Sequence, residues 1–598
     1  MADTLVVAID FGTTFSGVAA AYSANPEAPD ELNIVKTWPG GNNITSDKVP
    51  SEITYNGLNA TASASQSSQA PLNGKRKFDA FKDDSTPSNS GRMRWGYQIR
   101  PDEDRLRCLK LLLDPTQPIP DYVSLPDVQQ QLLANGKNIS TAVADYLRAL
   151  YAHTKVILGR RYGQQFVATT KLTVILTVPA VWSDAAKDAT LKAAEAAGMG
   201  DTIGMISDPE AAAVYTLQAI QPNHLKIGHN FVVIDAGGGT VDLISYSIRQ
   251  LTPLRLDELA KGSGGFCGAT FLNIRFEQFV RTKLGSTAFN AICTAKPKSW
   301  LMALKYFEDY VKRNFDPDEE DVFNIPFPGV PDNEKAGVEG GFLIMDTADV
   351  DNIFRPIVAN IISLVEGQIL QVRSSGAEVN GLLLVGGFGQ SECLMKALQA
   401  RFSTGVHKIE VMQPVNAWTA VVRGAVLRGL EGAEMVTTRK ARRHYGVSCS
   451  ELFDASRHPA SCKKWDDTEE KWVADNRMSW AIVKGQTVSS TTPVLVPFYR
   501  TFVAGQSKTV TEELVISDAD SAPSAFSLTP GSGTRVSCRM LVNLNTVPAN
   551  LWEVDRNSRG KAYHRLNYKI GMQIESGGLR FDFRVDDVVY GRVNATFT

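Results

Sequence analysis

Two turns rich in glycine and threonine carry the residues most able to do chemistry. The first is Asp10-Phe11-Gly12-Thr13-Thr14, and the second is Asp235-Ala236-Gly237-Gly238-Gly239-Thr240, with Asp242 after it. Exposed backbone N–H groups in such turns can hold phosphate oxygens, and glycine lets the backbone approach a ligand because it has no Cβ. Asp10 and Asp235 each end an apolar run, and their carboxylates can hold a magnesium ion through its water shell. We therefore predict a site for phosphate and Mg²⁺.

A third turn, Val385-Gly386-Gly387-Phe388-Gly389, follows the apolar run 381–384. A helix is predicted over about 392–401, so the amides of this turn would face a ligand at a helix N-terminus. A single glycine turn is usually only a tight turn, but three of them, two following Ile-Asp, favour a ligand site. The pattern is neither a P-loop nor a Rossmann turn, because strands rather than helices are predicted after the first two turns.

Two hairpins must position the first two turns. The β-branched runs 5–9 and 18–22 flank the first turn, and the runs 231–235 and 241–248 repeat the arrangement around the second. A strand–turn–strand unit that occurs twice predicts two related α/β lobes that face each other. Between the hairpins we predict a buried strand over 171–179 and a helix over 184–197 that stops at Gly198.

The chain has 598 residues, which is too long for a single hydrophobic core. We predict a two-lobed domain over 1–435, with lobe I at about 1–228 and lobe II at about 229–435. Residues 436–445 form a basic run, interpreted as a solvated linker in preference to a nuclear signal. Short alternating strands with turn residues predict an all-β, sandwich-like domain over 446–598.

Two further segments are predicted to be irregular. Polar residues dominate 57–92, which indicates a surface excursion, and 329–341 is predicted to be a loop because it is rich in glycine and proline.

Composition excludes several classes of protein. Lys and Arg number 62 against 64 Asp and Glu, so no overall positive field would hold nucleic acid. No uninterrupted apolar run is long enough to span a membrane, and the N-terminus lacks the features of a signal peptide. Seven widely spaced cysteines without a C-x-x-C pair, and seven isolated histidines, predict neither disulfides nor a zinc site. A reduced, cytoplasmic setting is expected.

Five strings together resemble the nucleotide-contact motifs of the actin-like ATPase superfamily, and most closely those of the 70-kilodalton heat-shock chaperones. They are VAIDFGTTFSG from Val7, VILTVPAVWSDAAKDATLKAAEAAGM from Val174, ISDPEAAAVYTL from Ile206, VVIDAGGGTVD from Val232 and LLLVGGFGQS from Leu382. The set spans almost all of residues 5–430. The resemblance implies a duplicated ribonuclease H-like α/β domain that binds ATP or ADP with Mg²⁺, followed by a β domain that binds unfolded polypeptide, with co-chaperones as further partners.

The chain also departs from the family pattern. Asp208 stands where the family usually has glutamate, Gln390 replaces the arginine that stacks on adenine, and Trp418 lies in a segment that differs from the family's. The interdomain linker is basic instead of acidic and leucine-rich, and no helical lid sequence is present. These features are similar to the lid-less, atypical branch that includes heat shock 70 kDa protein 12.

The resemblance assigns roles to individual residues. The predicted catalytic residues are Asp10, Lys110, Asp208, Asp235 and Thr240. The predicted nucleotide-binding residues are Gly12, Thr13, Thr14, Gly237, Gly238, Gly239, Thr240, Gly268, Asp309, Lys312, Arg313, Gly386, Gly387, Phe388 and Gln390.

Some of these assignments have simpler alternatives. Lys110 could be a solvated lysine on an amphipathic helix, and Asp309, Lys312 and Arg313 could form an exposed charged helix face. Cys267, close to Gly268, is interpreted as a buried thiol in preference to a nucleophile. Asp208 is shorter than glutamate, which predicts slow turnover.

Three functions remain open from the sequence. The first is a chaperone-like ATPase whose nucleotide state biases peptide binding in the β domain. The second is a nucleotide-sensing scaffold that binds ATP with little hydrolysis, and the third is a metabolite kinase of the same superfamily. Because the basic linker has few apolar groups to bury, we expect weak, salt-dependent coupling between ATP and the β domain.

Overall fold

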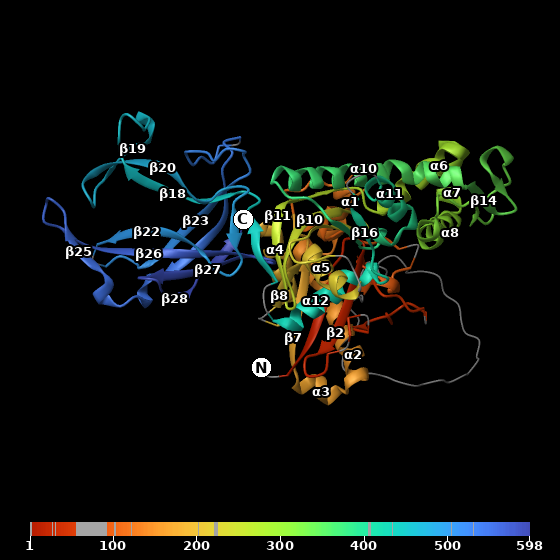
Figure 1. Ribbon diagram of the computed structural model, residues 1–598, viewed down its shortest axis with the longest axis horizontal. Coiled ribbons are helices and arrows are strands. Elements are labelled where there is room, and N and C mark those ends of the chain that lie inside the picture. Colours follow the sequence, from red (N-terminus) through yellow and green to blue (C-terminus); the bar gives the residue numbers. More distant parts are fainter. Residues whose placement is uncertain are drawn as a thin grey trace, which may run out of the picture.

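The computed structural model describes residues 3–597 except 27, 30, 43, 56–92, 101–102, 121, 201–202, 221–224, 405–407, 433–434, 504 and 530. The predicted surface excursion over 57–92 lies outside the described residues. Figure 1 shows a mixed α/β part on one side and an all-β part on the other, and the C-terminal end of the chain lies between them.

Lobe I is built on a six-stranded sheet with the order β3-β2-β1-β7-β8, in which β4 also pairs with β2. The strands are β1 (Thr4–Asp10), β2 (Phe15–Tyr22), β3 (Asn33–Ile34), β4 (Val49–Pro50), β7 (Lys171–Val178) and β8 (Ile203–Ser207). β1 runs antiparallel to β2 with Asp10 opposite Gly17, which confirms the first predicted hairpin, and parallel to β7. A separate pair consists of β5 (Ile53–Thr54) and β6 (Arg94–Trp95).

The described residues of lobe I include the helices α1 (Leu125–Ala134), α2 (Ile139–Tyr162), α3 (Gln164–Thr169) and α4 (Asp184–Ala196). Side chains of α2 and α4 share a buried core with β1 and β7, for example Leu147, Ala186 and Leu176. The N-cap of α4 is Ser183, whose hydroxyl accepts from the Ala186 N–H, and the positive φ of Gly198 ends this segment as predicted.

Lobe II is built on a seven-stranded sheet with the order β16-β15-β9-β10-β11-β17-β21. The strands are β9 (Asn230–Ala236), β10 (Val241–Leu251), β11 (Leu254–Gly265), β15 (Gly381–Val385), β16 (Glu410–Met412), β17 (Val436–Lys440) and β21 (Thr487–Ser489). β9 and β10 form the second predicted hairpin, with Asp235 opposite Asp242.

Two strands of this sheet correct the predicted domain boundary. Residues 436–440, predicted as the start of a solvated linker, form β17, which runs parallel to β11. β21 comes from the predicted β domain, yet it pairs antiparallel with β17 and forms the edge of the lobe II sheet. The linker prediction is therefore wrong at 436–440, because backbone hydrogen bonding to β11 and β21 fixes this segment.

The described helices of lobe II include α6 (Thr270–Leu284), α7 (Ser286–Ala295), α8 (Pro297–Tyr306), a π-helix (Phe307–Val311), α9 (Lys312–Asn314), α10 (Thr347–Ser374) and α11 (Glu392–Phe402). Helix α10 packs on β10 and β11 and α11 packs on β16, whereas α6 packs on α10, and α7 and α8 pack on α6 and on each other. A three-stranded sheet of β12 (Val322–Pro326), β14 (Phe342–Asp346) and β13 (Val338–Glu339) lies among them. The predicted loop 329–341 thus contains the short strand β13.

Helices α5 (Asp208–Ala219) and α12 (Ala420–Glu431) pack together at the centre of the two-lobed part. A Cβ at Gly424 would lie 1.7 Å from the Ala211 carbonyl oxygen, so only glycine allows this close crossing. Their side chains share one buried core with strands of both lobes, including Val6 and Val233. This helix pair therefore couples the two sheets mechanically.

Helix α10 is long and apolar enough to cross a membrane by length and composition alone. Its buried residues include Ile361 and Val365, which share a core with Ile234 and Leu243 of the lobe II sheet. We interpret α10 as a core helix, because this face packs on the sheet.

The C-terminal part is a β-sandwich. One sheet has the order β19-β20-β18-β23-β24-β29, and the other has the order β22-β26-β27-β28 with β25 on β26. The strands are β18 (His444–Leu452), β19 (Lys463–Asp466), β20 (Lys471–Ile482), β22 (Val494–Phe502), β23 (Thr509–Ser517), β24 (Arg535–Asn543), β25 (Glu553–Arg556), β26 (Ala562–Glu575), β27 (Gly578–Val585), β28 (Val588–Arg592) and β29 (Asn594–Phe597). Leu514 and Met540 of the first sheet pack in one core with Tyr568 and Phe583 of the second, as in other two-sheet sandwiches.

Candidate functional site

A cavity of about 530 Å³ is lined by residues of both lobes. Its lining contains every predicted site residue except one: Asp10, Gly12, Thr13, Thr14, Lys110, Asp208, Asp235, Gly237, Gly238, Gly239, Thr240, Asp309, Lys312, Arg313, Gly386, Gly387, Phe388 and Gln390. Residues more than 370 positions apart in the chain therefore meet at one place.

The three glycine turns face one another in this cavity. A Cβ at Gly238 would lie 2.1 Å from Thr14 Oγ1, so the second turn lies directly against the first. A Cβ at Gly386 would lie 2.4 Å from the Ala236 carbonyl oxygen, which brings the third turn against the second. Glycine is required at these contacts because any side chain would collide with the neighbouring turn.

Gly268 is the predicted residue that does not line the cavity. Its N–H lies 3.3 Å from the Gly239 carbonyl oxygen, and a Cβ there would lie 2.5 Å from the Gly238 oxygen. Gly268 therefore supports the second turn from behind. The neighbouring Cys267 is buried, which raises the pKa of its thiol to about 12 and favours the buried-thiol interpretation over a nucleophile.

Buried carboxylates gather below the turns. Removal from water raises the pKa of Asp235 well above its usual range, and the charge of Asp208 adds to this shift. Burial also raises the pKa of Asp208, against the opposing effect of Lys110, and raises that of Asp242 to about 6. Like charges in this cleft thus repel one another, and a bound cation would relieve this repulsion.

Two buried lysines form ion pairs with carboxylates that line the cavity. Lys110 Nζ lies 3.4 Å from Asp208 Oδ2, and Lys48 Nζ lies 2.6 Å from Asp10 Oδ2. Lys110 is only 4% exposed, so the alternative of a solvated surface lysine is wrong. Sequence reasoning missed Lys48, because nothing in the run Ser46-Asp47-Lys48-Val49 marks it and only the pairing of β4 with β2 brings it to Asp10.

The far wall of the cavity is aromatic and basic. The Arg313 guanidinium lies 4.9 Å from the centre of the Trp418 ring, and Trp418 meets Phe15 edge-on at 5.9 Å. A Cβ at Gly387 would lie 3.3 Å from the Trp418 indole. Phe15 was not predicted as a site residue, although it directly follows the first turn, and Trp418 was noted only as a departure from the family pattern.

Lys312 and Asp309 have different environments. Lys312 Nζ donates to the Ala269 carbonyl oxygen at 3.1 Å and to Asn273 Oδ1 at 2.9 Å. Asp309 pairs with Lys305 at 2.6 Å, and the Lys305 side chain is 75% exposed while that of Asp309 is 40% exposed. The alternative of an exposed charged face therefore describes Asp309 but not Lys312.

Comparison with known proteins shows what this chain is similar to. A model described as "Hsp70 protein" matches residues 157–441, and one described as "Domain of unknown function (DUF8568)" matches residues 439–588. Human "Heat shock 70 kDa protein 12A" is 24% identical over 537 residues, covering 76% of this chain and 73% of the human protein. Human "Heat shock 70 kDa protein 12B" is 26% identical over 562 residues, covering 79% and 76% respectively. The mouse 12A protein is 25% identical over 540 residues, with 76% and 73% covered.

These matches support a relationship of this chain to the atypical, Hsp70-like proteins. Members of the wider Hsp70 family share an actin-like ATPase fold and generally bind ATP or ADP with magnesium. The three facing turns of the Hsp70-like chain agree with that fold, in which the nucleotide lies between the lobes.

A directly ligated metal ion does not fit the arrangement in this Hsp70-like chain. Within the described ranges, no group of three or more Asp, Glu, His or Cys side chains is placed to hold a metal. Asp10 Oδ2 is already engaged by Lys48, and its Oδ1 lies 3.4 Å from Thr177 Oγ1. A hydrated ion held by Asp10 and Asp235, as predicted, would have to share the Asp10 carboxylate with the lysine.

The β-sandwich of the Hsp70-like chain contacts the back of the site. Ser576, in the turn between β26 and β27, accepts from the Ser207 N–H at 2.7 Å and donates to Glu210 Oε2 at 2.5 Å. Arg439 of β17 donates to the same Glu210 oxygen at 2.9 Å. Ser207 and Glu210 flank Asp208, whose carboxylate lines the cavity, so the β domain contacts the residues on either side of a predicted catalytic group.

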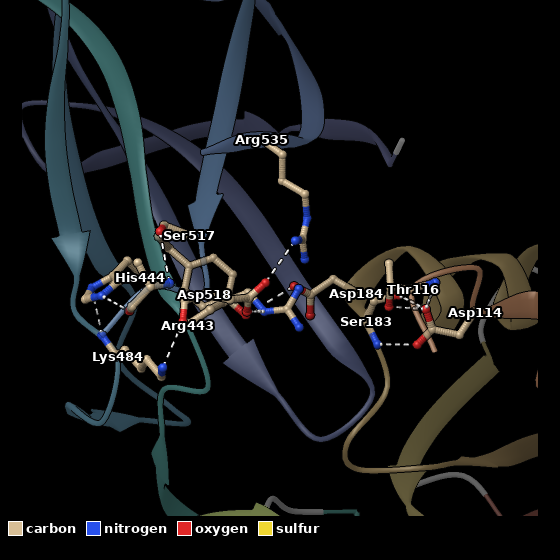
Figure 2. Close-up of polar contacts among 12 residues, drawn as sticks. Asp114, Thr116, Ser183, Asp184, Arg443, His444, Lys484, Ser517, Asp518 and Arg535 are labelled. Atoms are coloured by element: carbon tan, nitrogen blue, oxygen red, sulfur yellow. Dashed lines mark hydrogen bonds and ion pairs between the residues drawn. The ribbon is translucent and has the colours of Figure 1, made fainter. Parts of the chain in front are cut away.

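A second polar junction also joins the two parts, and Figure 2 shows Arg443, Asp518, Arg535 and Asp184 in it. Arg443 lies 3.5 Å from Asp518, which also binds Arg535 at 2.9 Å. The Tyr445 hydroxyl donates to Asp184 of α4 at 3.1 Å. The basic run predicted to be solvated therefore pairs with acidic groups of both parts, and Arg442 does so as well with Glu258 at 3.4 Å.

Proposed function

We propose that this chain binds ATP or ADP in the cleft and that its nucleotide state is coupled to polypeptide binding by the β-sandwich. The observation that carries the proposal is the meeting of three glycine turns around one cavity of about 530 Å³, a size suited to a nucleotide. The lining is basic and aromatic at one end and has turn amides and hydroxyls at the other, which matches the two ends of a nucleotide.

The phosphates would lie on the turns. Gly12 and Gly238 line the cavity without a side chain, so backbone N–H groups of these turns can donate to phosphate oxygens, and Thr13, Thr14 and Thr240 offer hydroxyls. The Lys110 ammonium supplies positive charge at the inner end of the cavity. The base would lie at the other end, where Arg313 and Trp418 offer a flat, polarisable surface.

Slow hydrolysis follows from the same arrangement. A water that attacks the terminal phosphate needs a base and electrostatic cover for the spreading charge. Asp208 and Asp235 have raised pKa values, which suits proton acceptance, but Asp208 is held by Lys110 and carries a side chain shorter than glutamate. We therefore propose weak ATPase activity. We give no residue the role of holding a magnesium ion that neutralises the phosphate charge.

Coupling to the β domain would run through α5. Lobe closure around a nucleotide moves the first turn of α5, and Ser207 and Glu210 in that region are bonded to Ser576 of the β domain. If the first turn of α5 has one position with nucleotide and another without it, the contact with the β domain differs between the two. The nucleotide can shift this equilibrium only by as much as its affinity differs between the two positions. Unfolded polypeptide is the proposed partner of the β domain, with co-chaperones and a cytoplasmic location as further proposals.

A nucleotide-sensing scaffold is the second candidate. It is favoured by one observation, namely that two carboxylates expected to serve catalysis are neutralised by buried lysines. Such a site could bind ATP firmly and turn it over very slowly.

Calorimetric titration of the full chain with ATP and ADP tests the proposed function. Gly238→Val is expected to abolish binding, because a Cβ there would collide with Thr14. Gly591→Val is the matched control, since nothing lies within 4 Å of a Cβ at Gly591 in β28. Equal ATP affinity in Gly238→Val and the parent would show that the phosphate assignment is wrong.

Turnover assays then separate the candidates. Stimulation of phosphate release by unfolded peptide supports the chaperone-like ATPase, and ATP binding without release supports the scaffold. Phosphorylation of a sugar would contradict both candidates and support a metabolite kinase.

A further inference from the structure

The ion pair between Lys48 and Asp10 lies inside the cavity. Both residues line it, and their side chains are only 9% and 7% exposed. The Nζ–Oδ2 distance is 2.6 Å, the length of a charge-assisted hydrogen bond. The pair is therefore part of the cavity wall and not of the solvent-exposed surface.

The fold holds Lys48 in this position. Lys48 directly precedes β4, and β4 pairs with β2. On β2, a Cβ at Gly17 would lie 3.3 Å from both Cγ and Cε of Lys48, so the lysine stem passes over a position without a side chain. The Lys48 carbonyl oxygen accepts from Ser46 Oγ at 2.7 Å and from the Tyr97 hydroxyl at 3.2 Å. Gly17 is opposite Asp10 in the hairpin register, so the stem leads to the carboxylate.

The ammonium group lies where a hydrated divalent cation was expected. Asp10 was predicted to hold Mg²⁺ through water, but its Oδ2 binds Lys48 and its Oδ1 faces Thr177. A fixed ammonium is a compact positive charge with three donors, which suits phosphate oxygens as well as carboxylate. The chain thus already supplies a cation beside the first glycine turn.

We propose that Lys48 is a specificity-determining residue that replaces the divalent cation beside Asp10, so that this chain binds nucleoside di- and triphosphates without requiring Mg²⁺. The inference rests on the proposed nucleotide site. It concerns binding alone, and no hydrolytic step depends on it.

The two alternatives differ in one measurable property. If Lys48 supplies the charge, removing Mg²⁺ leaves nucleotide affinity nearly unchanged. If the pair is only structural, nucleotide binding needs Mg²⁺ to neutralise the phosphates, and the lysine must leave Asp10 or share it with the ion.

The test is calorimetric titration of the full chain with ATP, in excess Mg²⁺ and separately in excess EDTA. We expect the parent dissociation constant to change by less than about threefold between the two conditions. Lys48→Met is expected to weaken metal-free binding by about ten- to a hundredfold, because one charge-assisted contact is lost. Mg²⁺ should restore most of that loss, since Asp10 is then free for a hydrated ion.

Two further variants control the experiment. Lys48→Arg keeps the positive charge and should keep most of the metal-free affinity. Lys36→Met removes an exposed lysine of the same lobe, 53% exposed and paired with Asp47, and should behave as the parent does. Thermal unfolding shows whether Lys48→Met folds; if it does not, the parent titrations with and without Mg²⁺ still decide.

Each outcome has one meaning. A parent affinity that falls about threefold or more in EDTA overturns the role of Lys48 but leaves the nucleotide site intact. Failure of the parent to bind ATP or ADP under either condition overturns the proposed function itself.

Discussion

Arg439 donates to Glu210 at 2.9 Å, with side chains only 9% and 0% exposed. The pair joins β17, which leads into the β-sandwich, to α5, which begins at a residue of the cavity. Salt screens exposed charges strongly but buried pairs weakly. A solvated basic linker led us to expect weak, salt-dependent coupling. Because the Arg439–Glu210 pair is buried, we now expect the contact between β17 and α5 to resist salt.

Arg439→Met is expected to destabilise the chain by about 3–5 kcal/mol, because it leaves the Glu210 carboxylate buried without its cation. Adding Glu210→Gln should recover part of the loss, since the buried charge is then removed. Chemical denaturation measures both, with Arg457→Met, 68% exposed, as the near-neutral control.

Hydrogen exchange at low and high salt checks the same contact. Protection of β17 and of the β26–β27 turn should persist at high salt in the parent and fall in Arg439→Met. Loss of protection in the parent at high salt would mean that exposed pairs such as Arg443–Asp518 hold the junction instead.

Asp242 predicts a pH dependence of stability. Burial raises its pKa from 3.8 to about 6, so its protonated form is favoured in the folded state. The raised pKa of Asp242 therefore contributes to the free energy of unfolding. This contribution is fully present below about pH 4 and is lost as pH rises through about 6. Asp242→Asn should therefore be more stable than the parent at pH 7, by up to about 3 kcal/mol, with the difference vanishing towards pH 4.

Urea denaturation without nucleotide across this pH range measures the difference. Asp467→Asn is the control, because Asp467 lies exposed in the turn between β19 and β20. Parallel curves for Asp242→Asn and the parent would show that Asp242 does not titrate in this window.

Arg313 and Trp418 predict which end of the cavity holds the base. Arg313→Met should weaken ATP binding about three- to thirtyfold, the range expected for loss of a cation–π contact, and leave the binding of inorganic triphosphate unchanged. Trp418 fluorescence should change on ATP binding but not on triphosphate binding. Lys305→Met, 75% exposed on the preceding turn, is the control. Equal losses for both ligands would place the phosphates, not the base, at Arg313.

Asp208 predicts slow turnover that a longer side chain corrects. Asp208→Glu adds one methylene towards the cavity and should raise the rate of phosphate release about tenfold or more, if carboxylate position limits general-base catalysis. Single-turnover assays measure this rate, with Asp467→Glu as the control. An unchanged or lower rate would mean that the Lys110–Asp208 pair, and not side-chain length, limits hydrolysis.

Much of the two-lobed fold was accessible from sequence, because buried hairpins with Ile-Asp and glycine at their turns have a strong local signature. The helix from Asp184 and the turn at Gly386 were predicted for the same reason, since caps and glycines act locally. The clustering of Asp10, Asp235 and Gly386 followed from recognising the repeat and the family resemblance.

What the sequence missed depends on contacts between distant segments. Lys48 carries no local mark, and its role arises only because β4 returns to β2 above Gly17. The basic run at Arg439 was taken as solvated because charge runs usually are, yet its acidic partners lie at Glu210 and Glu258, far away in the chain. The π-helix at Phe307–Val311 likewise has no signature in composition.

The position of β21 at the edge of the lobe II sheet has a consequence for synthesis. A ribosome that has released all the cavity residues, the last of which is Val421, has not yet delivered β17 or residues 487–489. Until it does, β11 presents an open row of backbone donors and acceptors, the kind of surface on which nascent chains pair wrongly with one another. The two-lobed part of this molecule therefore matures only after β18, β19 and β20 of the sandwich have been translated, and a fragment cut at residue 435 would keep that edge permanently exposed.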